Sequence, residues 1–379
     1  MKKTVSFCLI LAMLMLCAAC GAQPAETTLP ATTTTTPTTE TMPLEEGIRN
    51  IILIIGDGMG DAHIEAGALM SGKTPPYADW AHTHANTNSL DADGNATVTT
   101  DSAAAATALA TGMLTTNGKV GMDAGGNTSY KTILDYANEM GKSTGVVTTD
   151  LLTGATPGGF SGHTTDRDND EGIRNTQLYS GVTLLCGSYT NTYKTYKDTI
   201  ETAGYTVSTS LNETAKHMDA EKAYWQLSEK LEAITPKALE YLAQDRDGFV
   251  VMIEQAHVDK YSHSNNFGQM HLCVNSLNNT VQAVLDWAQG RNDTVVIITA
   301  DHETGGLSVG EEGQFLQTET TADGKTISYA FSSDGHTNSP VSVYCWGFQP
   351  DFAKYAMDGD PAMIKNTAVF QMMLDILQE

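Results

Sequence analysis

Nearly uninterrupted apolar runs that alternate with helical segments constrain the fold of this chain more than any other feature. The runs at 50–55, 249–253 and 294–299 are almost wholly apolar, as expected of strands buried on both faces of a parallel sheet. An alanine-rich stretch at 102–111, followed by Gly112, has the composition and the stop signal of a helix. The alternation predicts an α/β fold, a three-layer sandwich with helices on both faces of a large, mostly parallel central sheet.

The same patterns place the other elements. Further strands are expected at 145–149 and 341–346, and further helices at 131–140, 270–289 and 362–377. The segment 220–243 is expected to form one or two helices, broken near Pro236. Because no repeat and no second low-complexity stretch follows residue 45, residues 46–379 are predicted to form one catalytic domain.

The first 45 residues have a different composition. Two lysines precede an apolar run at 5–19, which is shorter than a membrane-spanning helix and typical of a secretory signal. The run ends at Cys20 in a context that resembles the lipobox of bacterial lipoproteins. Residues 1–19 are therefore predicted to be cleaved, with Cys20 lipidated; simple secretion is the alternative. Residues 20–45, rich in threonine and proline, are predicted to be a linker. This predicts an exported protein, lipid-anchored to the bacterial cell envelope on its extracytoplasmic side.

Charge and cysteine content restrict the classes of ligand. Asp and Glu total 45 against 21 for Lys and Arg, a net charge of −24, which argues against nucleic-acid recognition. An anionic substrate would need concentrated positive charge, which bound metal ions provide. Cys186, Cys273 and Cys345 are widely spaced and form no CxxC pair, so we expect buried small hydrophobes. Any metal must then be held by histidine and carboxylate.

Residue types that bind metal ions or anions follow four of the expected strands. In chain order they are Asp57, Thr156, Arg167, Glu254, Asp259, His263, Asp301 and His302. Ligands of open α/β sheets bind outside the carboxyl ends of the strands. Mixed histidine and carboxylate donors fit zinc, and oxygen donors fit magnesium. A single Asp could be a turn residue, and the 254–263 segment alone could be a salt-bridge cluster. The coincidence of four strands favours a metal site.

Ser102 opens the alanine-rich helix. At this place free backbone N–H groups and the helix dipole favour an anion. A serine nucleophile needs a base or a metal, and because no GxSxG motif surrounds Ser102, metal activation fits better than a hydrolase triad. The alternative is that Asp101 and Ser102 only cap the helix.

Six segments resemble the alkaline phosphatase family, in chain order. They are IILIIGDGMG at 51–60, TTDSAAAATALATG at 99–112, GATPGGFSGHTTDR at 154–167, MIEQAHVDKYSH at 252–263, ITADHETGGL at 298–307 and DGHT at 334–337. Together they cover nearly all of the domain, and their combination is specific. The resemblance implies the family's fold and the hydrolysis of phosphate monoesters through a phosphoserine at a binuclear zinc site, with release of inorganic phosphate.

The resemblance also implies roles for individual residues. Ser102 matches the serine that forms the phosphoserine, and Arg167 matches the arginine that clamps the phosphate. Apart from the resemblance, the place of Lys260 next to Asp259 predicts that it contributes positive charge for the substrate. Two Zn²⁺ and one Mg²⁺ are implied. The second zinc site matches Asp57, Ser102, Asp301 and His302. The first zinc site matches Asp259, His263 and His336. The magnesium site matches Asp57, Thr156 and Glu254.

The chain departs from the family pattern at two places. Gly154 stands where the family usually has an Asp or His that supports the magnesium shell, which puts the third site in question, with Lys260 as a compensating candidate. The stretch 302–336 is too short for the large insertion of some members, so it gives no support for a dimer, although a homodimer stays open. A related two-metal phosphodiesterase or sulfatase is the alternative function, and a non-catalytic phosphate- or metal-binding lipoprotein is a third.

Overall fold

The computed structural model describes residues 47–378 of the chain. The predicted signal at 1–19 and the whole of the predicted linker at 20–45, including Cys20, lie outside the described residues. None of the helices in the described part combines the length and the apolar character needed to cross a membrane.

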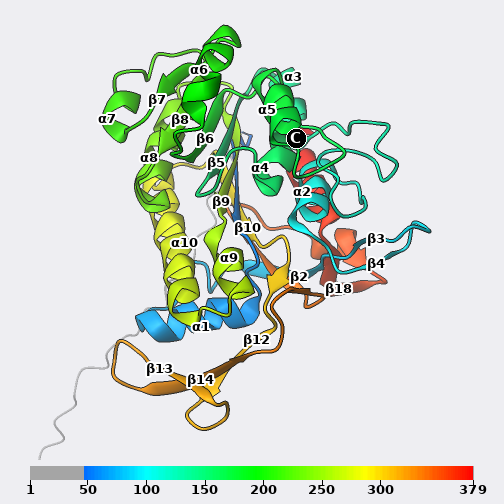
Figure 1. Cartoon of the computed structure of the whole chain (residues 1–379), viewed down its shortest axis with the longest axis vertical. Helices are drawn as coiled ribbons and strands as arrows, with labels where there is room; N and C mark the ends of the chain where they lie inside the picture. Colours follow the sequence, from blue (N-terminus) through cyan, green and yellow to red (C-terminus); the bar gives the residue numbers. More distant parts are fainter. Residues whose placement is uncertain (1–46, 379) are drawn as a thin grey trace, which may run out of the picture. The chain divides into compact units, whose positions relative to one another are not determined.

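An eleven-stranded, mostly parallel sheet is the centre of the fold (Figure 1). Strand β1 lies between β10 and β9, parallel to both, with Ile52 opposite Val296 and Val251. The parallel part continues through β5, β6, β8 and β7, whereas β16 runs antiparallel to β10 and to β2. The strands, in sheet order, are β17 (Ala356–Met357), β18 (Asp360–Lys365), β2 (Ala81–Asn86), β16 (Val341–Trp346), β10 (Thr294–Thr299), β1 (Asn50–Gly56), β9 (Phe249–Gln255), β5 (Ser143–Thr148), β6 (Leu184–Ser188), β8 (Ala223–Leu227) and β7 (Thr206–Ser208).

Helices cover both faces of this sheet, which confirms the predicted three-layer sandwich (Figure 1). One layer consists of α1 (Asp61–Ser71), α8 (Leu231–Leu242) and α10 (Phe267–Ala288). The other consists of α2 (Ser102–Thr111), α3 (Ile133–Glu139), α4 (Ala155–Ser161), α5 (Asp170–Leu178) and α11 (Thr367–Gln378). The remaining helices are α6 (Tyr193–Thr202), α7 (Leu211–Thr214), α9 (His257–His263) and the short 3₁₀ helix η1 (Phe352–Tyr355).

The core explains why these segments take these positions. Every residue of β1, β9 and β10 is buried, as expected of inner strands covered on both faces. Helix α2 is buried along its whole length, and its alanines let it pack closely against α4 and α11. It ends at Gly112, whose φ of 71° is the left-handed conformation that glycine adopts most easily.

Two predicted helical segments are wrong in part. Residues 223–227 form strand β8, because this aromatic-containing stretch pairs in parallel with β6 and is entirely buried. The helix that follows keeps Pro236 inside it rather than breaking there. Residues 360–365 form strand β18, which pairs with β2, so the final helix begins only at Thr367. In both cases pairing with a distant strand outweighs the local helical pattern.

Three small sheets lie outside the central one. The strands β12 (Leu307–Glu311), β14 (Thr326–Phe331) and β13 (Gln317–Thr320) form an antiparallel meander that extends away from the central sheet (Figure 1). A two-stranded ladder pairs β11 (Glu303–Thr304) with β15 (His336–Thr337) at the base of this excursion. The strands β3 (Ser89–Leu90) and β4 (Ala96–Val98) form a separate hairpin.

Candidate metal centre

Three adjacent central strands deliver acidic side chains to one edge of the sheet. Asp57 follows β1, Glu254 is the last residue but one of β9, and Asp301 follows β10. Because β1 pairs with both neighbours, the carboxyl ends of these strands meet. The ladder between β11 and β15 then brings His336 opposite Thr304. These connections gather side chains that are up to 279 residues apart in the sequence.

The first group, which we term the inner cluster, consists of Asp57, Asp301 and His302. One ligand atom from each lies within 4.8 Å of the others. Nε2 of His302 is 3.1 Å from Oδ2 of Asp301 and 3.6 Å from Oδ1 of Asp57. All three residues are buried, and His302 and Asp301 have no exposed surface. This arrangement can hold one cation deep in the protein.

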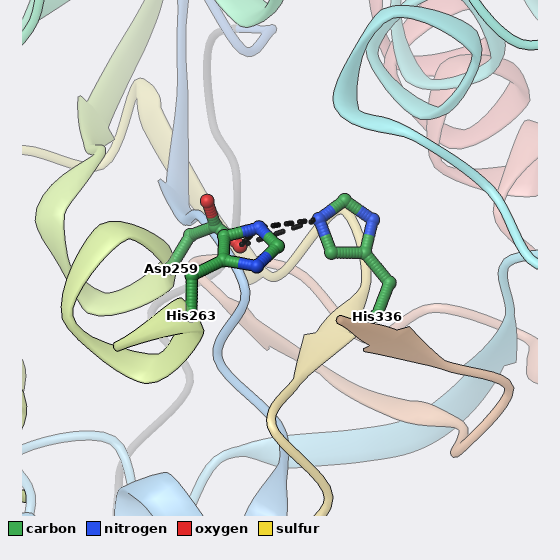
Figure 2. Close-up of side chains that lie close together, drawn as sticks. All are labelled: Asp259, His263 and His336. Atoms are coloured by element: carbon green, nitrogen blue, oxygen red, sulfur yellow. Dashed lines mark hydrogen bonds and ion pairs between the residues drawn. The ribbon is translucent and has the colours of Figure 1, made fainter. Parts of the chain in front are cut away.

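The second group, the outer cluster, consists of Asp259, His263 and His336 (Figure 2). Nε2 of His263 and Nε2 of His336 lie 3.1 Å apart, and Oδ1 of Asp259 is 3.3 Å and 3.4 Å from them. The side chain of His263 is 41% exposed, so this cluster reaches the surface. The ring of His336 also stacks on that of His302, with centroids 3.5 Å apart, so the two clusters are neighbours.

Hydrogen bonds on the far side of the outer histidines indicate which ring nitrogen carries the lone pair. Nδ1 of His263 lies 2.5 Å from the carbonyl oxygen of Asp334, and Nδ1 of His336 lies 2.8 Å from that of Thr100. A carbonyl only accepts, so each Nδ1 donates, and it is the Nε2 atom of each ring that faces the cluster and would offer its lone pair to a bound metal ion. Two facing lone pairs and a carboxylate oxygen suit a cation, and a carbonyl partner on the other nitrogen is typical of metal-binding histidine.

A third group of oxygen atoms surrounds Glu254. Burial raises the pKa of Glu254 to about 8, although a hydrogen bond from the Thr148 hydroxyl opposes this effect. The buried hydroxyl of Thr156 lies close enough to Glu254 to lower the pKa of that carboxyl, which opposes the effect of burial. Asp57 is close enough for the charge of Glu254 to raise its pKa. The three predicted magnesium ligands are therefore neighbours, and all of them offer oxygen.

Buried negative charge supports the fit of this donor set to cations. Burial raises the pKa of Asp57 well above its ordinary value, and the nearby carboxylates of Asp301, Asp259 and Glu254 add to this rise. Within the described residues, Oδ1 of Asp57 and Oδ2 of Asp301 are buried without hydrogen-bond partners. Buried carboxylates are costly unless they are paired or coordinate metal. The residues present therefore fit bound metal ions.

Ser102 lies at the edge of the inner cluster, and Arg167 contacts the residue that precedes it. Oγ of Ser102, the first residue of α2, is 3.2 Å from Nε2 of His302. Asp101 caps this helix by accepting from the backbone N–H of Ala104, and its other carboxylate oxygen is 3.0 Å from Nη1 of Arg167. One carboxylate thus fixes the start of the helix and the guanidinium together.

Lys260 follows Asp259 on helix α9. Its Nζ lies 2.6 Å from Oδ1 of Asp150, a residue just past the end of β5. The ammonium group is thereby held at the carboxyl edge of the sheet, near the residues that surround Glu254. This position is compatible with the predicted contribution to substrate binding.

The structure also identifies supporting residues that the sequence analysis did not assign to the site. Oγ1 of Thr304 donates to Oδ1 of Asp259 at 2.5 Å and lies 3.2 Å from Nδ1 of His302, so it connects the two clusters. Asp101, expected only as a helix cap, holds Arg167. The sequence could have indicated Asp101, because it directly precedes Ser102. Thr304 could not be identified in this way, because threonines are common next to strand ends.

Among residues 47–378, the other cysteines and histidines belong to neither cluster. Cys186 and Cys345 are buried and Cys273 is only partly buried, which corrects the expectation for Cys273; all three are free thiols. His63 is fully buried, where desolvation lowers its pKa to about 4, and its ring bonds to the Ser262 hydroxyl.

Comparisons with known proteins agree with this geometry. The sequence profile described as alkaline phosphatase matches residues 48–195 and 211–346. Alkaline phosphatase 4 of Bacillus subtilis is 31% identical over 297 residues, which span 70% of this chain and 64% of that protein. Alkaline phosphatase of Escherichia coli is 27% identical in an alignment that is 385 residues long with its gaps and covers 79% of this chain and 81% of that protein.

Solved structures show the same fold. Alkaline phosphatase from the Antarctic bacterium TAB5 superposes with a TM-score of 0.74 at 25% identity, covering 88% of this chain and 98% of that one. A substituted form of that enzyme, with a TM-score of 0.75, has magnesium bound in its M3 site. The profile match extends over most of the chain, and the fold agrees with that of solved alkaline phosphatases. This protein therefore belongs to the alkaline phosphatase family.

Proposed function

We propose that this protein hydrolyses phosphate monoesters through a phosphoserine at Ser102 and releases inorganic phosphate. The observation that carries the proposal is the position of the Ser102 hydroxyl. It lies at the N-terminus of α2, 3.2 Å from His302 of the inner cluster, with Arg167 anchored beside it by Asp101. A nucleophile, an anion-binding helix end and a guanidinium therefore converge on one place.

Two Zn²⁺ and one Mg²⁺ are the cofactors we propose. Asp57, Asp301, His302 and Ser102 would hold one zinc ion, Asp259, His263 and His336 would hold the other, and Asp57, Thr156 and Glu254 would hold magnesium. When bound, these ions would lower the pKa of the serine hydroxyl and of a water molecule, and would neutralise charge on the phosphoryl group.

The protein's own residues account for positioning. The free N–H groups at the start of α2 and the planar guanidinium of Arg167 bind the non-reacting phosphoryl oxygens. Oγ of Ser102 releases its proton to solvent and attacks phosphorus; the new O–P bond forms, and the ester oxygen departs with the electron pair and takes up a proton from solvent. Water then attacks the phosphoserine and loses a proton, and the serine oxygen leaves and is reprotonated.

The difference in burial between the clusters sets the direction of approach. The inner cluster is closed, whereas His263 of the outer cluster is half open to solvent. The leaving group and the attacking water are therefore expected on the outer side, opposite Ser102. In-line displacement requires this arrangement of attacking and leaving oxygens.

Ser102→Ala tests the proposal. We expect zinc content to be retained and turnover of an aryl phosphate to fall by about three orders of magnitude or more, because the nucleophile is lost. Ser208→Ala, which alters another buried serine in β7 at the far edge of the sheet, is the matched control and should remain active. Unchanged turnover in Ser102→Ala would exclude the nucleophile.

The same assay separates the alternative functions. A phosphate diester and a sulfate ester are offered beside the monoester, with and without a chelator. A preference for the diester or the sulfate ester would favour the corresponding hydrolase instead. Binding of phosphate without turnover of any ester would favour a non-catalytic binding protein.

We also propose that the protein is exported and lipid-anchored to the bacterial cell envelope through Cys20. The support is the apolar run at 5–19 that ends at this cysteine, followed by a threonine- and proline-rich stretch. An extracytoplasmic location would give the site access to phosphate monoesters outside the cell. No nucleic-acid partner is proposed, since the chain is strongly acidic.

A further inference from the structure

The carboxylate of Asp150 lies close to Gly154. Gly154 precedes α4 with an ordinary φ of −58°, so its backbone conformation does not require glycine. A Cβ atom added there would lie 3.4 Å from Oδ2 of Asp150 and 3.0 Å from the carbonyl oxygen of Leu151. A side chain at 154 would therefore be in van der Waals contact with the carboxylate of Asp150.

Asp150 is connected to the oxygen group around Glu254. Its backbone N–H donates to Oγ1 of Thr148 at 2.9 Å, and the Thr148 hydroxyl in turn donates to Oε2 of Glu254. The charge of Asp150 is also close enough to raise the pKa of Glu254. The Asp150 carboxylate is therefore an immediate neighbour of the proposed magnesium ligands without being one of them.

The other oxygen of Asp150 reaches Lys260. The 2.6 Å contact joins a carboxylate that is about a quarter exposed to an ammonium that is about half exposed. As a surface ion pair it would add less than about 1 kcal/mol to stability, so stability does not explain its placement. What the pair does accomplish is to fix a long, flexible lysine side chain, which otherwise samples many rotamers.

We propose that Asp150 is a positioning residue that replaces the absent side chain at 154. Through Oδ1 it fixes Lys260 toward the phosphate site, and through Oδ2 it supplies a carboxylate just outside the Asp57, Thr156 and Glu254 site. A carboxylate in this position favours a hydrated divalent cation by accepting hydrogen bonds from its water ligands. The proposal rests on the proposed function, because it gives a purpose to that magnesium site and to Lys260.

The test uses Asp150→Asn, which keeps the shape and removes the charge. With zinc saturating, we expect Mg²⁺ to bind about ten-fold more weakly, measured by metal content after equilibrium dialysis and by the Mg²⁺ dependence of Tm. Inorganic phosphate, measured as a competitive inhibitor, should bind several-fold more weakly, while kcat changes less than KM. Asp323→Asn removes an exposed ion pair to Lys325 in the β13–β14 meander and is the control.

Relocating the carboxylate provides the second arm. In Asp150→Ala/Gly154→Asp the space vacated at 150 receives the new side chain, and Mg²⁺ affinity should recover toward the original value. Asp150→Asn combined with Lys260→Gln should weaken phosphate binding no more than Lys260→Gln alone, since both changes act through one contact.

Three outcomes would overturn the proposal. They are Mg²⁺ and phosphate affinities in Asp150→Asn that equal those of Asp323→Asn, a relocation variant that stays as weak as Asp150→Ala, and additive losses in the double variant. Zinc content and Tm report folding in every variant. Because Mg²⁺ binding is measured without turnover, it can also be repeated in Ser102→Ala. Failure of the phosphoserine assignment would therefore leave this result unaffected.

Discussion

The ionisable side chains of the metal centre differ in how burial and neighbouring charges set their pKa values. Burial acts to raise the pKa of Asp259, but hydrogen bonding with His336 and the nearby charge of His302 outweigh it, and the pKa is lowered. For His336 burial acts to lower the pKa, and the bond to Asp259 raises it. For Asp57 and Glu254, burial dominates and raises the pKa. Metal binding at these carboxylates must therefore displace protons.

Glu254 should make the stability of the metal-free protein depend on pH. Its pKa is raised from 4.5 to about 8 in the folded state, so the folded chain keeps a proton that the unfolded chain loses. Stability is then highest below about pH 4.5 and falls as the pH rises through 8. Glu254→Gln stays neutral and lacks this loss. Between pH 5 and 8, the Tm of metal-free Glu254→Gln should rise by several degrees relative to that of the unchanged protein. This corresponds to a difference in the free energy of unfolding on the order of a few kcal/mol.

The comparison is made as a difference between the two proteins, because contributions such as that of His336 are common to both and cancel. Scanning calorimetry in a chelator provides the Tm values. A constant difference across this range would contradict the assignment of Glu254 as the titrating group. Addition of Mg²⁺ should reduce the pH dependence only in the unchanged protein.

At the scale of single elements, the start of α2 combines structure and binding. Asp101 has an extended backbone, caps the helix through Ala104 and contacts Gly118 and Arg167 through its second oxygen. Because most of its residues are alanine, the helix packs in the core along its whole length. Ser102 is therefore fixed in a buried first turn. Loss of the cap would affect the helix, whereas loss of the charge would affect the arginine.

Two substitutions at Asp101 separate these effects. Asp101→Asn keeps the oxygen that caps the helix and should cost less stability than Asp101→Ala, since only the bond from the Gly118 N–H to the second oxygen is lost. It also releases Arg167 and should weaken inhibition by phosphate several-fold. Asp101→Ala should weaken phosphate equally and also cost about 1 kcal/mol of stability. Arg167→Ala sets the upper limit of the phosphate effect and should retain zinc. Equal stability losses in both Asp101 variants would argue against this division.

How far the elements could be predicted depended on whether their signal was local. Two strands, at 50–55 and 294–299, were predicted from continuous apolar runs, and the helix at 102–111 from its run of small residues. Both patterns indicate a buried position, and the structure confirms all three elements. Strands β8 and β18 exist because β6 and β2 lie beside them, and nothing in their own sequence outweighs the helical pattern around them. The same is true of the contact between Asp150 and Lys260, which joins residues 110 positions apart.

At the scale of the whole molecule, the candidate site could be predicted because strand ends converge. Asp57, Glu254 and Asp301 follow strands that any parallel sheet would place side by side, so their proximity followed from the fold class. His336 has no strand run before it, and its place came only from the family resemblance. The structure gives the physical reason, the pairing of His336 with Thr304.

The proposed anchor is tested on the full chain. Cys20→Ser should move the protein from the membrane fraction to the soluble fraction and abolish labelling by a radioactive fatty acid, because the thiol that would carry the lipid is gone. Turnover per molecule should not change, since the site lies within residues 47–378. Cys17→Ser, three residues earlier in the signal, is the control and should keep the label. Retention of the label in Cys20→Ser would disprove the anchor.

The ladder between β11 and β15 has a consequence for how this protein can vary. The chain leaves the centre after Thr304 and returns at His336, and both ends are pinned to each other there. Because closing a loop costs little more free energy as the loop lengthens, the segment between these points can become longer or shorter while the paired residues keep their places. Variation in this segment would change access to the proposed site without moving the ligands that the ladder holds.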